Sequence, residues 1–297
     1  MRARFQGAGE EGRPQVILGT GFFISREGHV LTNSHATHQN ELDPADRISV
    51  EHRRMEYAAE ILGTDLSTNL TLLLVDTLPP DFRFIHLTDS SEMPPIGSMV
   101  VCISSPFEFD PSPSLALVTG VESRFGNKVF RVPYIRSSMR LGPAESGAPL
   151  LDLNGKLIGV TIASLPEVEQ SYSIPSRAAL RIRDDLLFSG KVTIGWLGFE
   201  VYPGSTKRAG SRIAIREVVP GTPAEKAGLA GEDELVRIGE HSIDEVTDVG
   251  NALFYLREGQ FVTVVVLREG EELSFTFRVA ARPDEEPENL AVPEGED

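Results

Sequence analysis

The stretch GPAESGAPLLDLNGKLIG, residues 142–159, joins a turn of small residues to a short apolar strand. Ser146 stands inside this turn, between Glu145 and Gly147. A serine in a tight turn exposes its hydroxyl, and the backbone N–H groups beside it can meet a developing negative charge. The stretch therefore predicts a β fold in which Ser146 is a candidate nucleophile.

Short apolar runs separated by Gly, Pro, Asn and Asp surround this stretch. They cover residues 21–24, 70–75, 98–103 and 156–162. Runs of this length and spacing, from Gly19 to about Ile174, are typical of an antiparallel β sandwich or barrel. The first part of the chain is therefore expected to be mainly β.

A helix is expected over residues 176–189, where apolar residues recur at helical spacing. Ser176 follows Pro175 and is expected to cap the start of this helix, and Gly190 is expected to end it. We expect the helix to lead to a second module that begins near Gly195. Its expected elements are strands after Phe199 and at 212–219, 234–238, 261–267 and 272–279, and helices at 223–227 and 246–256. Residues 268–271 are expected to form a hairpin turn with glycine at positive φ.

Composition narrows the function classes. The chain has 297 residues, which favours two domains, and its formal net charge is −16. Nucleic-acid binding needs clustered Lys and Arg, so no nucleic-acid partner is expected. No apolar run reaches the length of a membrane-spanning helix, and no membrane span is expected. Residues 1–11 lack the apolar segment of a signal peptide.

Three further features are assigned no catalytic or binding role. Cys102 is the only cysteine, and its apolar neighbours predict a buried, inert thiol. His35 and His38 have no cluster of further ligands nearby, so neither a metal nor a cofactor is expected. Residues 282–297 are acidic and too polar to pack, and are expected to form a disordered tail.

Two other stretches supply partners for Ser146. The stretch LTNSHA, residues 31–36, places His35 after an apolar strand as a candidate base. The stretch EILGTDLSTNLTLLL, residues 60–74, holds Asn69 and Asp65. A serine, a histidine and a third group that orients the histidine are the parts of a nucleophilic hydrolase site.

These motifs together resemble the HtrA/Deg family of serine proteases. Residues 19–35 are similar to the family's strand pair that ends at the catalytic histidine, and residues 103–107 resemble its Gly-Asn-Pro-Phe loop. Residues 173–176 match the exit from its second barrel, while GWLGF (195–199) and VVPGTPAEKAGL (218–229) resemble a PDZ domain. The order and spacing of these pieces extend the resemblance from about residue 19 to residue 281.

The resemblance implies a mainly β fold: a chymotrypsin-like double β-barrel followed by a smaller α+β PDZ domain. Its expected parts are an N-terminal arm (1–18), a protease domain (19–175), a helical linker (176–192), a PDZ domain (193–281) and the acidic tail (282–297). His35 and Asn69 would come from the first barrel and Ser146 from the second.

Asn69 falls where the family has its catalytic aspartate, because the apolar run after it fixes the alignment. Asp65 lies four residues earlier and is not assigned to the triad. The carbonyl of an asparagine can hold the histidine tautomer, but it carries no charge to stabilise the imidazolium. In a trypsin-like enzyme the change from Asp to Asn lowers kcat about 10⁴-fold.

The resemblance also implies two binding features. The oxyanion hole would use the backbone N–H groups of Ala144 and Ser146, although the family has glycine where this chain has Ala144. Glu145 would add a negative charge beside that hole. In the PDZ domain, Leu197, Gly198 and Phe199 would bind a peptide carboxylate through their N–H groups.

Two functions from different classes follow. One is a serine endopeptidase of HtrA/Deg type that acts on unfolded polypeptides, weakened by Asn69, with PDZ recognition of peptide C-termini. The other is an inactive pseudoprotease that serves as a peptide-binding or scaffold protein. The resemblance further implies a homotrimer, and a location in the periplasm or cell envelope if the native chain starts upstream with a signal peptide.

Overall fold

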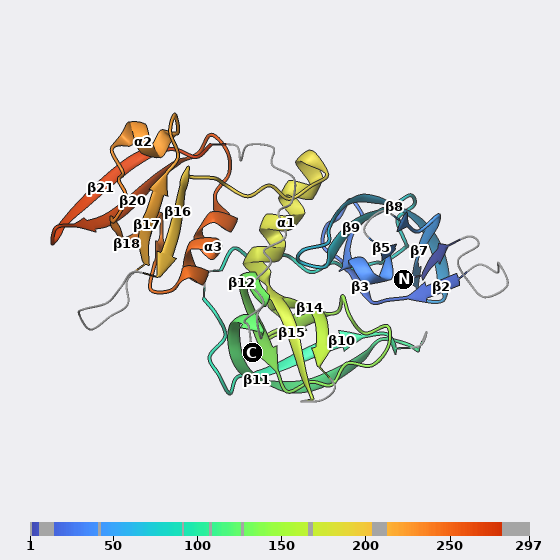
Figure 1. Ribbon diagram of the computed structural model, residues 1–297. Helices are drawn as coiled ribbons and strands as arrows, with labels where there is room; N and C mark the ends of the chain where they lie inside the picture. The colour runs from blue at the N-terminus through green and yellow to red at the C-terminus, as the bar shows by residue number, and fades with distance from the viewer. Residues whose placement is uncertain are drawn as a thin grey trace, which may run out of the picture. The chain divides into compact units, whose positions relative to one another are not determined.

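The computed structural model describes residues 2–5, 15–40, 43–90, 92–106, 109–125, 128–165, 169–203 and 213–280. The chain divides into two compact units, one made of residues 1–122 with 133–192 and the other of residues 123–132 with 193–297. Figure 1 shows that strands dominate both. The expected mainly β fold, with a larger part made of two β halves and a smaller α+β part, is confirmed.

The first half of the first unit is a seven-stranded antiparallel sheet. Its core gathers buried apolar side chains such as Phe23, Val30 and Leu73. In spatial order the strands are β2 (Gln15–Leu18), β1 (Arg2–Phe5), β7 (Arg47–His52), β8 (Met55–Asp65), β9 (Leu70–Val75), β4 (His29–Asn33) and β3 (Gly21–Phe23). The small hairpin β5 (His38–Asn40) and β6 (Asp43–Pro44) and the short helix η2 (Ser34–Ala36) complete this half.

The segment expected as an N-terminal arm contains two of these strands. β1 pairs with both β2 and β7, and Ala3 is fully buried between them. Arg2 forms ion pairs with Glu51 at 3.3 Å and with Glu56 at 2.7 Å. The segment joins the sheet because a small apolar residue reaches the core there, while the arginine side chain pairs with acidic residues of β7 and β8.

The second half of the first unit is a closed six-stranded barrel. Its strands, in order round the barrel, are β10 (Met99–Ser104), β11 (Ser112–Phe125), β12 (Lys128–Ser137), β15 (Gln170–Pro175), β14 (Leu157–Leu165) and β13 (Pro149–Leu151). Cys102 lies in its core with 0% exposure. Burial raises the pKa of this thiol to about 12, with the charge of Glu145 as a second cause, and the expected burial of the cysteine is confirmed.

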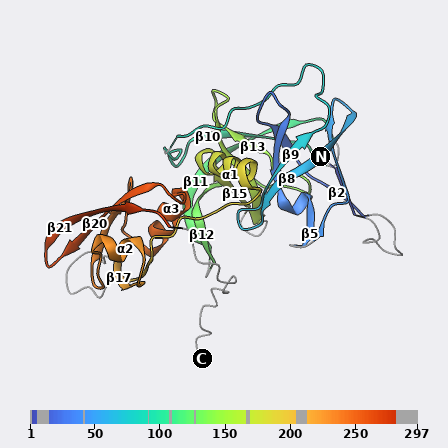
Figure 2. The same cartoon turned by 90° about the horizontal axis from the view of Figure 1, so that it is seen from above.

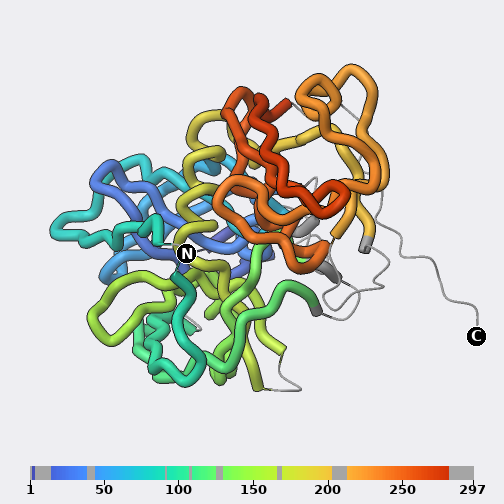
Figure 3. The backbone as a smooth tube through the Cα atoms, turned by 90° about the vertical axis from the view of Figure 1, so that its left-hand side faces the viewer, coloured from blue at the N-terminus to red at the C-terminus, as the bar shows by residue number. Residues whose placement is uncertain are grey.

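Helix α1 (Ser176–Ser189), the yellow helix in Figure 3, packs on β8 and β14 within the first unit. Gly190 ends it in the left-handed conformation at φ 70°, as predicted. The prediction that Ser176 caps the helix is wrong, because Pro175 holds the cap position and Ser176 is the first helical residue. The hydroxyl of Ser176 instead accepts a hydrogen bond from the N–H of Thr88.

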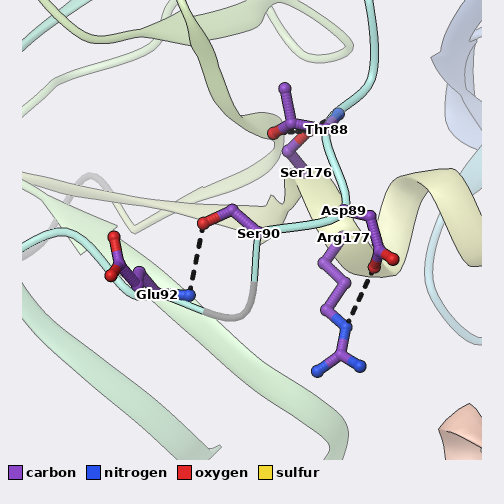
Figure 4. A network of polar contacts seen from close by, with 6 residues as sticks. All are labelled: Thr88, Asp89, Ser90, Glu92, Ser176 and Arg177. Atoms are coloured by element: carbon purple, nitrogen blue, oxygen red, sulfur yellow. Dashed lines mark hydrogen bonds and ion pairs between the residues drawn. The ribbon is translucent and has the colours of Figure 1, made fainter.

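The first turn of α1 anchors the connection between the two halves of the unit. Figure 4 shows the contacts: the N–H of Thr88 donates to Oγ of Ser176 at 2.9 Å, and Nε of Arg177 pairs with Asp89 at 3.2 Å. Oγ of Thr88 also donates to the carbonyl of Leu157 at 3.4 Å on β14. The connection is thereby tied to both the helix and the barrel.

The second unit is a sheet with two helices. The sheet order is β16 (Phe199–Pro203), β17 (Ile213–Val218), β18 (Glu234–Ile238), β20 (Phe261–Arg268) and β21 (Glu271–Arg278), with β19 (His241–Ser242) beside β18. The helices are α2 (Pro223–Ala227) and α3 (Val246–Tyr255). Figures 1 and 2 show β20 and β21 as a long hairpin, and Gly270 in its turn has φ 91°, as predicted.

The expected acidic tail lies outside the described residues. Among the residues that are described, no helix is long and apolar enough to cross a membrane.

Candidate active site

The turn that carries Ser146 presses directly on the first sheet. Gly147 has φ +89°, and a Cβ atom there would lie 2.2 Å from the carbonyl oxygen of Thr20 and 3.0 Å from the amide nitrogen of Asn33. The N–H of Thr20 donates to the carbonyl of Ser146 at 3.3 Å. Only a glycine fits this close approach of two backbones. The second half of the unit therefore places Ser146 against the first half of the same unit.

His35 stands in helix η2, which follows β4 at Asn33. Its side chain is exposed, and within the described part of the chain its imidazole makes no hydrogen bond. Because Asn33 touches the Gly147 turn, the segments that carry His35 and Ser146 are neighbours. The hydroxyl of Ser146 likewise has no hydrogen-bond partner among the described residues.

The side chain of Asn69 lies next to the backbone of His35, and most of its hydrogen bonds are to backbone groups. Its Oδ1 accepts from the N–H and the hydroxyl of Ser34, at 3.1 and 2.6 Å, and from the N–H of His35 at 3.3 Å. Its Nδ2 donates to the carbonyl of Ile162 on β14 at 2.9 Å. A flipped amide would face donors with its NH₂ group and an acceptor with its oxygen, so these contacts fix its orientation.

This orientation decides what Asn69 can do for the histidine. Three donors already use its only acceptor oxygen, and no hydrogen bond joins it to the imidazole of His35 within the described residues. An aspartate in this position would hold the Nδ1–H tautomer and stabilise the imidazolium. Asn69 does neither through Oδ1. It fastens the His35 segment to β14 instead.

The other acidic and histidine candidates are engaged locally. Asp65 accepts from the hydroxyl of Ser67 at 2.8 and 3.0 Å and from that of Thr68 at 2.5 Å, which closes its own turn. Nδ1 of His38 lies 2.9 Å from the hydroxyl of Thr37. The described residues contain no cluster of side chains that could hold a metal ion.

The candidate oxyanion hole has open donors. The N–H groups of Ala144 and Ser146 donate to no protein group in the described part of the chain. Ala144 has φ +69°, a left-handed conformation that costs a non-glycine residue roughly 1–2 kcal/mol. Its carbonyl accepts from the hydroxyl of Thr20 at 2.7 Å. Ala144 therefore holds this conformation under strain.

Glu145 does not stand free beside these donors. Its Oε1 accepts from the hydroxyl of Ser104 at 2.6 Å, and its Oε2 accepts a short hydrogen bond from the N–H of Gly142. Both carboxylate oxygens are thus used within the wall of the barrel and the turn itself.

The candidate peptide site of the second unit lies at the start of β16, which is the edge strand of its sheet. Leu197 is buried, and Gly198 has φ +85°. The N–H groups of both donate to no protein group among the described residues. Phe199 is the first residue of β16 and pairs with Val218.

Sequence reasoning missed four residues that organise the first site: Thr20, Ser34, Ser104 and Ile162. Thr20 lies between two glycines, which is a sign of close backbone approach that could have been used. Ser34, next to the histidine, contributes through its hydroxyl. Ser104 and Ile162 lie in other strands and carry no local signal for their roles.

Comparison with known proteins is consistent with this geometry. Residues 19–160 match a trypsin-like peptidase domain and residues 195–279 match a PDZ domain. The chain is 31% identical over 293 residues to a probable periplasmic serine endoprotease DegP-like of Marinomonas sp. (strain MWYL1), covering 93% of the chain and 61% of that protein. It is 30% identical over 313 residues to the protein of the same description from Pseudomonas fulva (strain 12-X), covering 100% of the chain and 63% of that protein.

The chain thus spans about 60% of the length of these curated relatives. Among solved structures, the HtrA-type protease AlgW with tripeptide is similar, with a TM-score of 0.71 and 25% identity over 95% of this chain and 93% of that one.

Proposed function

Because the chain belongs to the HtrA family, with a trypsin-like peptidase domain followed by a PDZ domain, we propose that it is a serine endopeptidase that cleaves unfolded polypeptides. The observation that carries the proposal is the Ser146 turn. It presents a hydroxyl without a partner among the described residues, next to two open backbone donors and beside the segment of His35.

In this proposal the described groups divide the chemistry among them. Ser146 Oγ attacks the carbonyl carbon of the substrate while His35 takes the hydroxyl proton and passes it to the leaving amine as the C–N bond breaks. Water, activated by His35, then hydrolyses the acyl-enzyme ester and frees Ser146. The N–H groups of Ala144 and Ser146 bind the oxygen that becomes negative. Asn69 holds the segment of His35 in place but leaves the imidazolium without a charged partner, so catalysis is weak.

Labelling by a fluorophosphonate probe tests the proposal. The chain is expected to be labelled at Ser146, slowly, and to degrade casein, while Ser146→Ala abolishes both. Mass spectrometry locates the label and a gel assay follows the casein. A wild-type chain that takes no label and degrades nothing would contradict the proposal.

The pseudoprotease is the second candidate, and one observation favours it. The acceptor oxygen of Asn69 is fully used by Ser34 and His35, so no side chain near the imidazole holds its productive tautomer within the described residues. In that case the first unit and the PDZ domain would bind peptides without cleaving them. Peptide binding without any labelling of Ser146 would support this candidate.

The PDZ domain is proposed to capture free C-termini of peptides. The peptide would add a strand along β16, and its carboxylate would meet the N–H groups at Leu197, Gly198 and Phe199. Relatives described as periplasmic support a proposed periplasmic location. A homotrimer remains part of the proposal, and light scattering of the purified chain would measure its mass.

Gly198→Ala should weaken peptide binding at least about tenfold. Gly198 has φ +85°, and a Cβ there would lie 2.5 Å from Cβ of Thr222, so the carboxylate loop must shift. Gly221→Ala is the matched control, because Gly221 has φ +81° and open space around it. Calorimetry would compare a free-acid peptide with its C-terminal amide. Equal affinity for the two peptides would argue against carboxylate capture.

A further inference from the structure

In the turn of residues 142–146, some backbone N–H groups are hydrogen-bonded within the turn and others are not. The turn has four backbone N–H donors, because Pro143 has none. The N–H of Gly142 donates to the carboxylate of Glu145, and the N–H of Glu145 donates to the carbonyl of Gly142 at 3.4 Å. The N–H groups of Ala144 and Ser146 are the two that remain open within the described residues.

Glu145 also ties this turn to the barrel wall. Its second carboxylate oxygen accepts from the hydroxyl of Ser104, at 2.6 Å, at the end of β10. Ser104 is 2% exposed, so the contact is made at a rigid, buried position. On the other side of the turn, the hydroxyl of Thr20 donates to the carbonyl of Ala144 and accepts from the N–H of Ser105 at 3.1 Å.

The turn needs such anchors because Ala144 is held at φ +69°. A glycine would adopt this conformation without strain, whereas an alanine relaxes out of it unless its surroundings prevent this. The carboxylate of Glu145 makes hydrogen bonds with a charged acceptor, which are roughly twice as strong as neutral ones.

We propose that Glu145 is a positioning residue that holds the turn of residues 142–146 in the conformation that keeps the N–H groups of Ala144 and Ser146 open for the substrate's carbonyl oxygen. This inference rests on the proposed endopeptidase function and assigns a residue to its oxyanion hole. Glu145 acts through Ala144 and does not itself touch the substrate. Its carboxylate charge, which the sequence alone places against a negative transition state, is stabilised by two hydrogen-bond donors, Ser104 and Gly142.

Removing the carboxylate tests this role. Glu145→Ala is expected to lower the rate of fluorophosphonate labelling of Ser146 about 10²-fold, as for the loss of one oxyanion donor. Glu145→Gln keeps one acceptor oxygen and should fall between the wild type and Glu145→Ala. Adding Ala144→Gly to Glu145→Ala should recover at least tenfold, since glycine needs no anchor at positive φ. A merely structural role would not be rescued in this way.

Control variants distinguish the positioning role of Glu145 from the effects of a lost charge and of misfolding. Glu92→Ala removes the same charge from an exposed position and should label at the wild-type rate. If Glu145→Ala does not fold, Ser104→Ala removes one of the two contacts and should slow labelling by a smaller factor. Wild-type labelling in Glu145→Ala, or the absence of rescue by Ala144→Gly, overturns the role of Glu145.

A crystal structure of Glu145→Ala decides the inference independently of activity. Ala144 is expected to leave positive φ when the carboxylate is removed. If the turn keeps its conformation, the inference is wrong whatever the activity. If the wild-type chain takes no label but the turn of the variant rearranges, the proposed function fails while the positioning role of Glu145 stands.

Discussion

Asn69→Asp is expected to raise the rate of peptide hydrolysis roughly 10²–10⁴-fold, the order lost by the reverse change in a trypsin-like enzyme. One carboxylate oxygen can keep the three donors from Ser34 and His35 that Oδ1 of Asn69 has now. The other replaces Nδ2, which donates to the carbonyl of Ile162 at 2.9 Å. Two acceptors repel each other at that distance, so this oxygen is expected to turn to the Nδ1–H of His35.

The carboxylate would then do what the amide cannot. It accepts from Nδ1–H, which leaves Nε2 of His35 able to take the proton of Ser146, and its charge stabilises the imidazolium. The gain is therefore expected mainly in kcat, with little change in KM. Hydrolysis of a fluorogenic peptide, together with the labelling rate of Ser146, would measure it.

Two controls make this result specific. Asn154→Asp adds the same charge in the exposed turn between β13 and β14 and should leave the rate unchanged. Adding Ser146→Ala to Asn69→Asp should remove the gain, because the carboxylate helps only through the nucleophile. No gain from a measurable starting rate would show that the base is organised differently. No activity before or after the change would favour the pseudoprotease.

Gly147→Ala is expected to lower the free energy of unfolding of the first unit by about 2–4 kcal/mol and to abolish labelling of Ser146. Part of the loss is the left-handed conformation at φ +89°. The rest is steric, because the new Cβ would lie 2.2 Å from the carbonyl oxygen of Thr20, and neither backbone can give way cheaply. The two halves of the unit would have to separate at the site.

Gly155→Ala is the matched control for this change. Gly155 has φ +80° but nothing within 4 Å of the added Cβ, so its cost should be only about 1 kcal/mol. Far-UV circular dichroism in urea would follow the whole chain, while fluorescence of Trp196, the single tryptophan, reports the second unit alone. Equal losses in the two variants, or a shift of the Trp196 transition, would contradict the steric explanation.

The sequence predicts the bounds of an element well when local residues mark both its start and its end. Helix α2 and strand β18 have the predicted bounds, because a Thr-Pro start and a glycine stop frame the one and a short run rich in apolar residues that ends before Gly239 marks the other. The turn between β20 and β21 follows from a glycine that tolerates positive φ, as does the end of α1 at Gly190. Strand β1 was missed, because its assignment depends on pairing with β7, far along the chain.

The identity and order of Ser146, His35 and Asn69 are properties of the sequence, and so is the absence of a carboxylate at position 69. The hydrogen-bond partners of the site's side chains depend on the tertiary structure. The amide of Asn69 is oriented by Ser34 and by Ile162, 93 residues away, and the carboxylate of Glu145 is taken up by Ser104, 41 residues away. A hydrogen bond has a direction and a partner, and chain segments this distant acquire both only when the barrel closes, for Glu145, and when the two halves of the first unit fold against each other, for Asn69.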